Sequence, residues 1–459
     1  MKIGLQHLTT PQKIATSFLA VILTGSLLLS LPWCHTATSD ASYLDHLFIS
    51  VSAVCVTGLW TESIHDTYNI YGQLVMLALI QTGGLGLMTI IGSFYHSIGQ
   101  KLDLKDQLAT GDALNRSSRM NLGDFLGRII RYTAVFEGVG ALLLTSFFVP
   151  RYGWAKGLFQ SVFTAISAFC NAGFDLMGNN SLIDHQTQPV LNWTIMALIV
   201  LGGIGFSVWF DIADQIASYQ HRRKGADWRY YLRHLRPHTK LVVLVTSLII
   251  LIGASLFLLV EWNNPGTLGY LSWPDKIMAS FFQTITMRTA GFASVDYTKA
   301  HPVSLLIFVV TMFIGGGAGG TAGGLKVTTF ALTIMLAVRE IRQSRYVSFD
   351  HHTIPGETVR SAFVISLAYV SLLLLGSGLL LSFDSHQNYL YLLFEAISAL
   401  ATVGVSVGLT PELSQASHFV LMALMFTGRI GPMTLLLSLR GRRRATYDVE
   451  YTNTEIIIG

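Results

Sequence analysis

Four short tracts that recur along the chain could do chemistry with their backbone oxygens. Each carries a glycine, and these glycines, at positions 58, 173, 291 and 404, are 115, 118 and 113 residues apart. Glycine adopts positive φ without a steric penalty, so such a tract can turn its carbonyl groups to one side. Carbonyls converging on one axis can replace the hydration shell of a cation. The pattern predicts an ion filter made of Val56, Thr57, Gly58, Asn171, Ala172, Gly173, Thr289, Ala290, Gly291, Thr402, Val403 and Gly404.

Short apolar stretches precede the four tracts and must position them. They have helical spacing but are too short to cross a bilayer, so we interpret them as re-entrant half-helices. A single glycine after such a helix is most simply its C-cap. Four glycines at matched spacing favour the filter over that interpretation. The stretches are 47–54, 158–169, 277–287 and 390–400.

Longer apolar stretches predict eight membrane spans, because each is long enough for a hydrocarbon core that needs about 20 residues. Two of them contain one charge each, Glu137 and Arg429. The first stretch could be taken for a signal peptide, but bulky residues at 31–34 occupy the place where cleavage requires small ones. The spans lie within 14–39, 67–100, 132–150, 185–210, 241–260, 300–325, 361–383 and 413–439.

The composition supports this class of protein and argues against others. Hydrophobic residues make up 51% of the 459 residues and charged residues 12%, against about 25% charged in soluble domains. A net charge of +4 gives no reason to expect nucleic acid as a partner. Three cysteines cannot form a disulfide framework or a CxxC metal site. We find no catalytic cluster and no covalent cofactor, so we do not expect an enzyme.

Basic residues predict the topology. They cluster after every second span, at 101–131, 222–240, 339–345 and 440–444. The positive-inside rule makes these loops and both chain ends cytoplasmic in a multi-pass protein, although lipid or partner binding is an alternative role for the clusters. Every repeat then contains two full crossings, so all four share one orientation. Inverted repeats, which are typical of many transporters, are not expected.

The predicted fold is an all-α membrane protein with eight transmembrane helices and four re-entrant half-helices. Its four pseudo-symmetric repeats, each a span, half-helix, filter tract and span, surround a central pore. The repeats are 1–100, 101–223, 224–345 with an intramembrane glycine loop, and 346–459 with a short cytoplasmic tail.

A second glycine cluster lies in the second span of every repeat. The clusters beginning at Gly83 and Gly202 are best interpreted as close helix packing through small residues. The third cluster has seven glycines in ten residues and should be a loop, because glycine disfavours helix by about 1 kcal/mol per residue. A flexible loop beneath a filter favours a gate over the alternative of a passive kink, and this gate is formed by Gly315, Gly316, Gly317, Ala318, Gly319, Gly320, Thr321, Ala322, Gly323 and Gly324.

The same loop matches the dinucleotide fingerprint G-x-G-x-x-G, with Glu340 beyond it. The preceding run corresponds to membrane spans in the other repeats, and no βαβ unit surrounds it. The gate is therefore favoured over a nucleotide site.

Two basic residues join the predicted gate. Arg429 stands where the other repeats have Gly84, Gly203 and Gly316. A charge in the middle of a span costs about 2.5–3.5 kcal/mol on insertion scales, so it should face the pore, where it would repel cations. A strut bonded to loop carbonyls is the alternative. Lys326, after the loop, has the same two interpretations, and Glu137 has no partner evident from the sequence.

These residues together resemble the Ktr/Trk/HKT superfamily of potassium transporters, most closely its bacterial KtrB-type subunits. The matching motifs are the first tract, the sequences NAGF and TAGF, the loop running into GGLK at 323–326, and GRIG at 428–431. Glycine in all four tracts implies potassium as the transported ion, with sodium as a candidate coupling ion. The fourth tract continues as VSVG, which makes its register the least certain.

The resemblance also implies partners. It implies a homodimer in the plasma membrane of a bacterium, activated by a cytosolic ring of RCK subunits similar to KtrA. Any nucleotide is expected on that ring. The competing function, a secondary transporter of a small solute, predicts inverted repeats and paired intramembrane charges, which this chain lacks.

Overall fold

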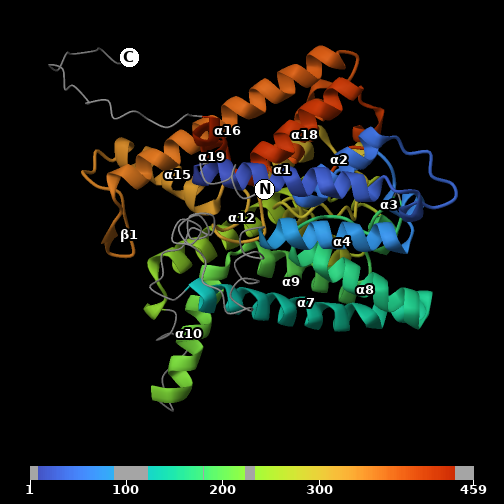
Figure 1. Cartoon of the computed structure of the whole chain (residues 1–459). Coiled ribbons are helices and arrows are strands. Elements are labelled where there is room, and N and C mark those ends of the chain that lie inside the picture. Colours follow the sequence, from blue (N-terminus) through green and yellow to red (C-terminus); the bar gives the residue numbers. More distant parts are fainter. Residues whose placement is uncertain (1–8, 87–121, 179, 223–232, 440–459) are drawn as a thin grey trace.

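The computed structural model describes residues 9–86, 122–178, 180–222 and 233–439, and these residues are mostly helical (Figure 1). Strand structure in the described residues is a small antiparallel hairpin of β1 (Ser348–Phe349) and β2 (His352–Thr353). One order of elements recurs four times: a long apolar helix, a shorter helix, an irregular tract and another apolar helix. This architecture agrees with the predicted all-α class.

Long helices open the four repeats. Each is long and apolar enough to cross a membrane, and about a third or less of each apolar segment is buried within the chain. Side chains such as Leu142, Leu259 and Leu375 are exposed on their outer faces, where lipid can replace water. The helices are α1 (Thr10–Leu29), α7 (Leu122–Tyr152), α12 (Pro237–Glu261) and α16 (Gly356–Phe383).

Shorter helices follow them and end at the filter tracts. With 12–16 residues, each spans about 18–24 Å, less than the roughly 30 Å of a hydrocarbon core. Most of their residues are buried, so they lie inside the protein. Two begin with a side-chain cap, from Ser42 and Asn388. They are α2 (Tyr43–Val54), α8 (Trp154–Phe169), α13 (Trp273–Thr286) and α17 (Tyr389–Leu400).

The second apolar helices are α4 (Ile70–Leu85), α9 (Pro189–Gly203), α14 (Pro302–Phe313) and α18 (Gln415–Ile430). All four stop within the stretch predicted to be one span. After α9 the chain bends by 97° into α10 (Phe206–Arg222). Residues 315–324 follow α14 and lead to α15 (Val327–Ile341), while α19 (Pro432–Leu439) follows α18.

The sequence predicted an interrupted span in the third repeat, whereas the second apolar helix ends early in all four repeats. Gly86, Gly205 and Gly431 have φ of 80°, 101° and 92°, a conformation that ends a right-handed helix. The first two glycine clusters, interpreted as packing sites, also contain a positive-φ glycine at which the helix ends. By length and hydropathy the described helices include four spans, or five with the bent α9 and α10, so a total of eight remains a prediction.

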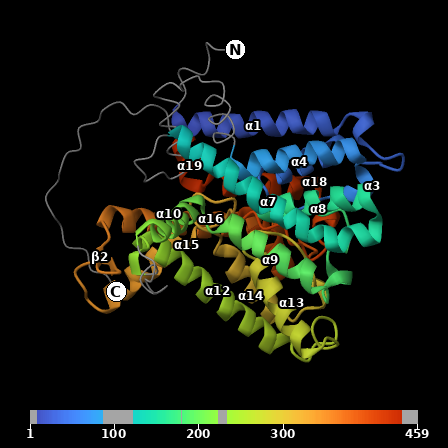
Figure 2. The same ribbon diagram turned by 90° about the horizontal axis from the view of Figure 1, so that it is seen from below.

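The repeats are arranged in a closed cycle. Contacts join α4 to α8, α9 to α13, α14 to α17, and α18 to α2, so each repeat touches the next and the fourth returns to the first. Figures 1 and 2 place α8 and α3 (Ile64–Thr67) at one end of the bundle, and α10, α15 and the hairpin at the other. Short 3-10 helices complete the loops: Pro32–Cys34, Ile183–His185, Tyr297–Lys299 and Thr410–Glu412.

Candidate functional site

The four tract glycines meet in a ring at the centre of this cycle. At every one, the position that a Cβ would take lies against a carbonyl oxygen of the next tract, and the fourth contact returns to the first tract. We call this arrangement the glycine ring. The distances are 2.5 Å from Gly58 to Ala172 O, 2.6 Å from Gly173 to Ala290 O, 2.6 Å from Gly291 to Val403 O, and 2.0 Å from Gly404 to Thr57 O. Any side chain larger than hydrogen would displace a neighbouring carbonyl.

The backbone of each tract alternates in handedness. The ring glycines have φ between 71° and 100°, and the residue two positions earlier is also positive, with φ of 56° at Val56, 58° at Asn171, 69° at Thr289 and 52° at Thr402. Three of those four residues are β-branched, for which positive φ is strained. Such strain is found at functional sites, where the surrounding structure enforces it. Alternation of this kind turns successive carbonyl groups to the same side of the chain.

Hydroxyl groups behind the ring hold this conformation. Ser52 Oγ accepts a hydrogen bond from Gly58 N at 3.0 Å, and Ser398 Oγ accepts one from Gly404 N at 3.0 Å. In the third repeat Thr286 Oγ1 donates to Phe292 O at 2.8 Å. The sequence interpretation missed these residues. A serine six positions before the glycine, present in three of the four repeats, was the available signal.

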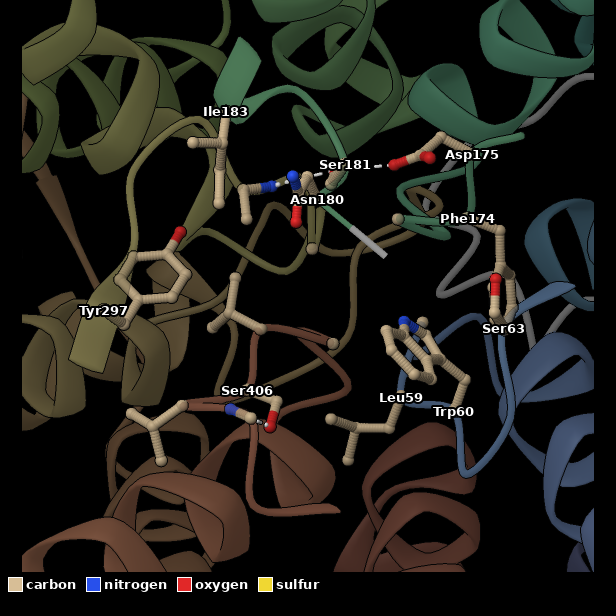
Figure 3. Close-up of a pocket in the computed structure, with 18 of the residues that line it drawn as sticks. Leu59, Trp60, Ser63, Phe174, Asp175, Asn180, Ser181, Ile183, Tyr297 and Ser406 are labelled. Carbon is tan, nitrogen blue, oxygen red and sulfur yellow. Dashed lines mark hydrogen bonds between the residues drawn. The ribbon is translucent and has the colours of Figure 1, made fainter. Parts of the chain in front are cut away.

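A cavity of about 300 Å³ opens outward from the ring. Figure 3 shows its wall built from all four repeats, with Trp60, Asp175, Tyr297 and Ser406 among the labelled residues. Asp175 accepts hydrogen bonds from Ser181 Oγ at 2.5 Å and from Met177 N at 3.0 Å. Burial raises the pKa of this carboxyl, and the two hydrogen bonds partly offset that rise. All four ring glycines thus line the floor of this cavity.

Residues 315–324, the glycine loop, lie on the other side of the ring. The loop leaves the third repeat and bonds to the second through backbone groups. Thr321 Oγ1 also donates to Phe169 O, at the end of α8, at 2.9 Å. The backbone bonds are Gly317 N to Gly203 O at 2.7 Å, Thr321 N to Gly202 O at 3.1 Å, and Phe206 N to Gly319 O at 3.1 Å.

Arg429 bonds the same loop from the opposite side. Its Nη1 donates to Thr321 O at 2.5 Å, and its Nη2 donates to Gly84 O at 3.1 Å and to Gly83 O. The loop and this one side chain therefore connect all four repeats beneath the ring. Lys326 Nζ donates to Ala322 O at 2.6 Å, within the loop itself. Both predicted basic residues thus bond to carbonyl groups, as the strut interpretation requires.

Close glycine packing supports the tracts from the side. Glycines of the second apolar helices lie against the last carbonyl of the half-helix in the same repeat. The positions that their Cβ atoms would take are 2.1 Å from Val54 O at Gly83, 1.8 Å from Phe169 O at Gly202, and 1.9 Å from Leu400 O at Gly428. The predicted packing through small residues is confirmed here. The helix ends at Gly86 and Gly205 were not predicted.

Comparison with known proteins decides the family. The TrkH family profile, described as a cation transport protein, matches residues 3–442. The Ktr system potassium uptake protein B of Vibrio alginolyticus is 36% identical and covers 93% of this chain and 90% of its own length. Its Bacillus subtilis counterpart is 34% identical, with 98% and 97% covered. The chain belongs to the TrkH family.

A further TrkH-family relative, the potassium/sodium uptake protein NtpJ of Enterococcus hirae, is 35% identical over 99% of this chain and 98% of its own. The crystal structure of the potassium transporter TrkH from Vibrio parahaemolyticus has the same fold, with a TM-score of 0.71 at 19% identity over 93% of this chain and 85% of that one. This TrkH-family chain is accordingly a multi-pass membrane protein with a cation transporter fold.

Two charged residues of this TrkH-family chain acquire partners that the sequence did not reveal. Glu137, on α7, accepts hydrogen bonds from Gln81 Nε2 on α4 at 3.2 Å to both carboxyl oxygens. Cys170, the first residue of the second tract, donates to Gln81 Oε1 at 3.5 Å. Arg288 begins the third tract and is 6% exposed. Contacts between helices far apart in the sequence thus create the surroundings of both Glu137 and Arg288.

Proposed function

We propose that this chain takes up potassium ions through the glycine ring, which acts as the selectivity filter. The single observation that carries the proposal is the closed cycle of glycine-to-carbonyl contacts around one axis. Carbonyl dipoles fixed by positive-φ glycines can replace the hydration shell of a monovalent cation, so the ion enters without a large desolvation penalty. The potassium uptake activity in the names of the two Ktr relatives supports the same ion.

Flux through the purified chain tests this proposal. Proteoliposomes loaded with K⁺ are diluted into K⁺-free buffer with a protonophore, and a pH dye reports the compensating proton entry. We expect faster dye quenching with K⁺ inside than with Na⁺ inside. Equal rates for the two ions would exclude the filter. A requirement for an organic solute would favour a secondary transporter instead.

The proposed gate is the glycine loop together with Arg429. Its support is position, because the loop and the guanidinium bond to all four repeats directly beneath the ring. The loop is held there by a few hydrogen bonds to backbone groups, so open and closed placements should differ by only a few kcal/mol. The fixed charge of Arg429 adds electrostatic repulsion of cations at this level.

Regulation and assembly are proposed from the relatives. The name "Ktr system" describes a protein that works with other components, and we propose a cytosolic RCK ring with bound nucleotide as the activator of a homodimer. Capture of that ring by the detergent-purified chain, and the mass of the chain in detergent, test these two points.

Sodium coupling and topology complete the proposal. The relative named for potassium and sodium uptake motivates a test of potassium uptake at graded external Na⁺. We place the chain in a bacterial plasma membrane with cytoplasmic termini, in line with its basic clusters. Accessibility of terminal tags to external protease checks that orientation.

A further inference from the structure

Arg288 is the only basic residue in the four filter tracts. The equivalent positions hold Cys55, Cys170 and Ala401. The side chain is 6% exposed and forms no ion pair with any residue in the described ranges. Burying a cation without a counter-ion is unfavourable unless its donors are bonded. One repeat therefore carries an unfavourable group that the other three lack, which calls for a specific role.

The partners of Arg288 point to that role. Its Nη2 donates to Gly315 O at 3.1 Å and more weakly to Thr246 Oγ1 at 3.4 Å. Gly315 is the first residue of the glycine loop. It is paired with the loop's other end, since Gly315 N donates to Leu325 O at 2.9 Å and Val327 N donates to Gly316 O at 2.9 Å. We call residues 315–316 and 323–327, which contain these pairs, the neck of the loop.

The neck is also packed against the fourth tract. The position of a Cβ at Gly324 is 3.5 Å from Ala401 Cβ, and that at Gly323 is 3.0 Å from Ala401 O. The tip of the loop, residues 317–322, instead bonds to the second repeat and to Arg429. The tip is therefore held by the second repeat and Arg429, whereas the neck is paired within its own repeat and packs against the fourth tract.

We propose that Arg288 is a positioning residue that fixes the neck to the third filter tract, so that gating moves only the tip. The neck has two ladder bonds and one charge-assisted bond, which is roughly twice as strong as a neutral one. The tip is held by three backbone bonds and the Thr321 hydroxyl to the second repeat, and by a charge-assisted bond from Arg429 of the fourth, so apart from the bond from Lys326 its holding contacts come from other repeats. These contacts between repeats break when the tip moves, while Arg288 keeps the base of the loop stationary beside the ring. This inference rests on the proposed gate.

Two matched disulfides test it. The Cβ positions are 3.5 Å apart both at the neck, for Gly324→Cys with Ala401→Cys, and at the tip, for Gly203→Cys with Ala322→Cys. That spacing lies in the range of about 3.5–4.5 Å that disulfides require. Potassium flux is measured in the proteoliposomes with the activating ring bound, under oxidation and after reduction. The chain with its native cysteines, treated in the same way, is the control.

We expect the tip disulfide to abolish flux until it is reduced. The neck variant alters the loop and the fourth tract, so its flux is compared only with itself, and we expect the same value under oxidation as after reduction. If the neck disulfide also blocks flux, the neck moves and this inference is wrong while the proposed gate stands. If neither disulfide alters flux, the proposed gate itself is wrong, and this inference fails with it.

Substitution of Arg288 gives a second readout. Arg288→Gln should raise flux without the activating ring about tenfold, the change expected for losing one hydrogen bond to a charged group. It should also lower the potassium-to-sodium flux ratio, because the neck and the third tract loosen together. Thr246→Val removes only the weaker contact and should leave both values unchanged. A reduced yield of folded Arg288→Gln with normal flux per molecule and a normal ratio would overturn the proposal. Should that variant fail to fold, the disulfides decide.

Discussion

The glycine ring and the glycine loop lie next to each other and are built on opposite plans. The ring repeats one contact four times, glycine against the carbonyl of the next tract, and closes on itself. The loop exists once, and each of its attachments is different: a ladder to its own repeat, backbone bonds to the second, and Arg429 from the fourth. A structure that coordinates an ion needs equivalent groups on every side. A structure that obstructs an axis needs only one segment crossing it.

The difference between the two regions arises from a small change of sequence. In the second and fourth repeats, a break at one positive-φ glycine leads into the next helix, α10 or α19. In the third repeat, residues 315–324 separate α14 from the short lead into α15. In the described parts of the second and fourth repeats no irregular segment of this length follows the second apolar helix, and here it bonds to the second repeat and to Arg429. An irregular segment in one repeat thus breaks the symmetry of the cycle while the glycine ring keeps it.

The largest expected effect is on the ring. Gly404→Ala places a methyl group 2.0 Å from Thr57 O, so that carbonyl must move and the potassium-to-sodium uptake ratio should fall to near one. Gly58→Ser, whose Cβ lies 2.5 Å from Ala172 O, should lower the ratio less. Uptake is measured in cells that lack other potassium systems.

Gly408→Ala is the matched control for the ring. Gly408 lies in the same repeat with φ of 80°, but nothing lies within 4 Å of its Cβ position. The ratio should therefore stay at its native value. A loss of selectivity as large as that of Gly404→Ala would mean that backbone strain, and not the contact with Thr57, explains the effect.

The next effect separates the loop from the ring. Deleting residues 317–321 removes all of the tip except Ala322. It should raise potassium flux in the absence of the activating ring by at least about tenfold, since several hydrogen bonds of the loop are lost. The potassium-to-sodium ratio should change little, because the glycine ring is intact. Flux is measured in the same proteoliposomes, with Gly356→Ala, whose Cβ position has no neighbour within 4 Å, as a control. Wild-type flux and wild-type dependence on the ring would reduce the loop to a passive kink.

A smaller effect is expected at Arg429. Arg429→Gln removes the charge and most of the bonds to Thr321 O and Gly84 O, so flux without the activator should rise several-fold. Arg429→Lys keeps the charge but cannot reach the loop and the first repeat together, because lysine lacks the guanidinium fork. Comparison of the two in the flux assay separates repulsion from bonding. Equal increases in both would assign the effect to the lost bonds.

The smallest effect is expected far from both regions, in the hairpin that follows α15. A hydrogen bond from Lys240 lowers the pKa of the Asp350 carboxyl, and their ion pair is 2.7 Å long. A carboxyl with a lowered pKa stabilises the fold above its ordinary pKa, and this contribution is lost as the pH falls through the lowered value. Asp350→Asn should therefore lower the melting temperature in detergent slightly at neutral pH and not in strong acid. An unchanged potassium-to-sodium ratio is expected at both pH values.

The ring could be predicted from the sequence because it is periodic. Four glycines at nearly equal spacing, each after a short apolar stretch, carry information that no single tract carries. The fourth tract, where the register was least certain, has the same backbone as the others, with positive φ at Thr402 and Gly404. Periodicity also explains the good agreement for the half-helices, three of which end at the predicted residue and the fourth one residue earlier.

The remaining features depend on contacts that a linear sequence does not display. Gly205 and Gly431 lie in apolar stretches whose composition suits an unbroken helix, and the break requires the neighbouring loop and the half-helix carbonyls. Gln81, the partner of Glu137, lies 56 residues away on another helix. The bond from Arg288 to Gly315 crosses 27 residues. Charge and glycine content identified these residues, but only the packed structure pairs them.

The cycle of four tracts closes within one polypeptide, and this has a consequence for genetics. With the glycine ring as the proposed filter, each copy of the chain carries a complete ion path of its own, so two associated copies would contain two paths that are selective independently. A damaged ring in one copy leaves the path of its neighbour unaltered in composition. Co-expression of native and Gly404→Ala chains would then yield additive conductances and a selectivity between those of the two chains, unlike a tetrameric channel in which a single altered subunit affects a pore shared by all.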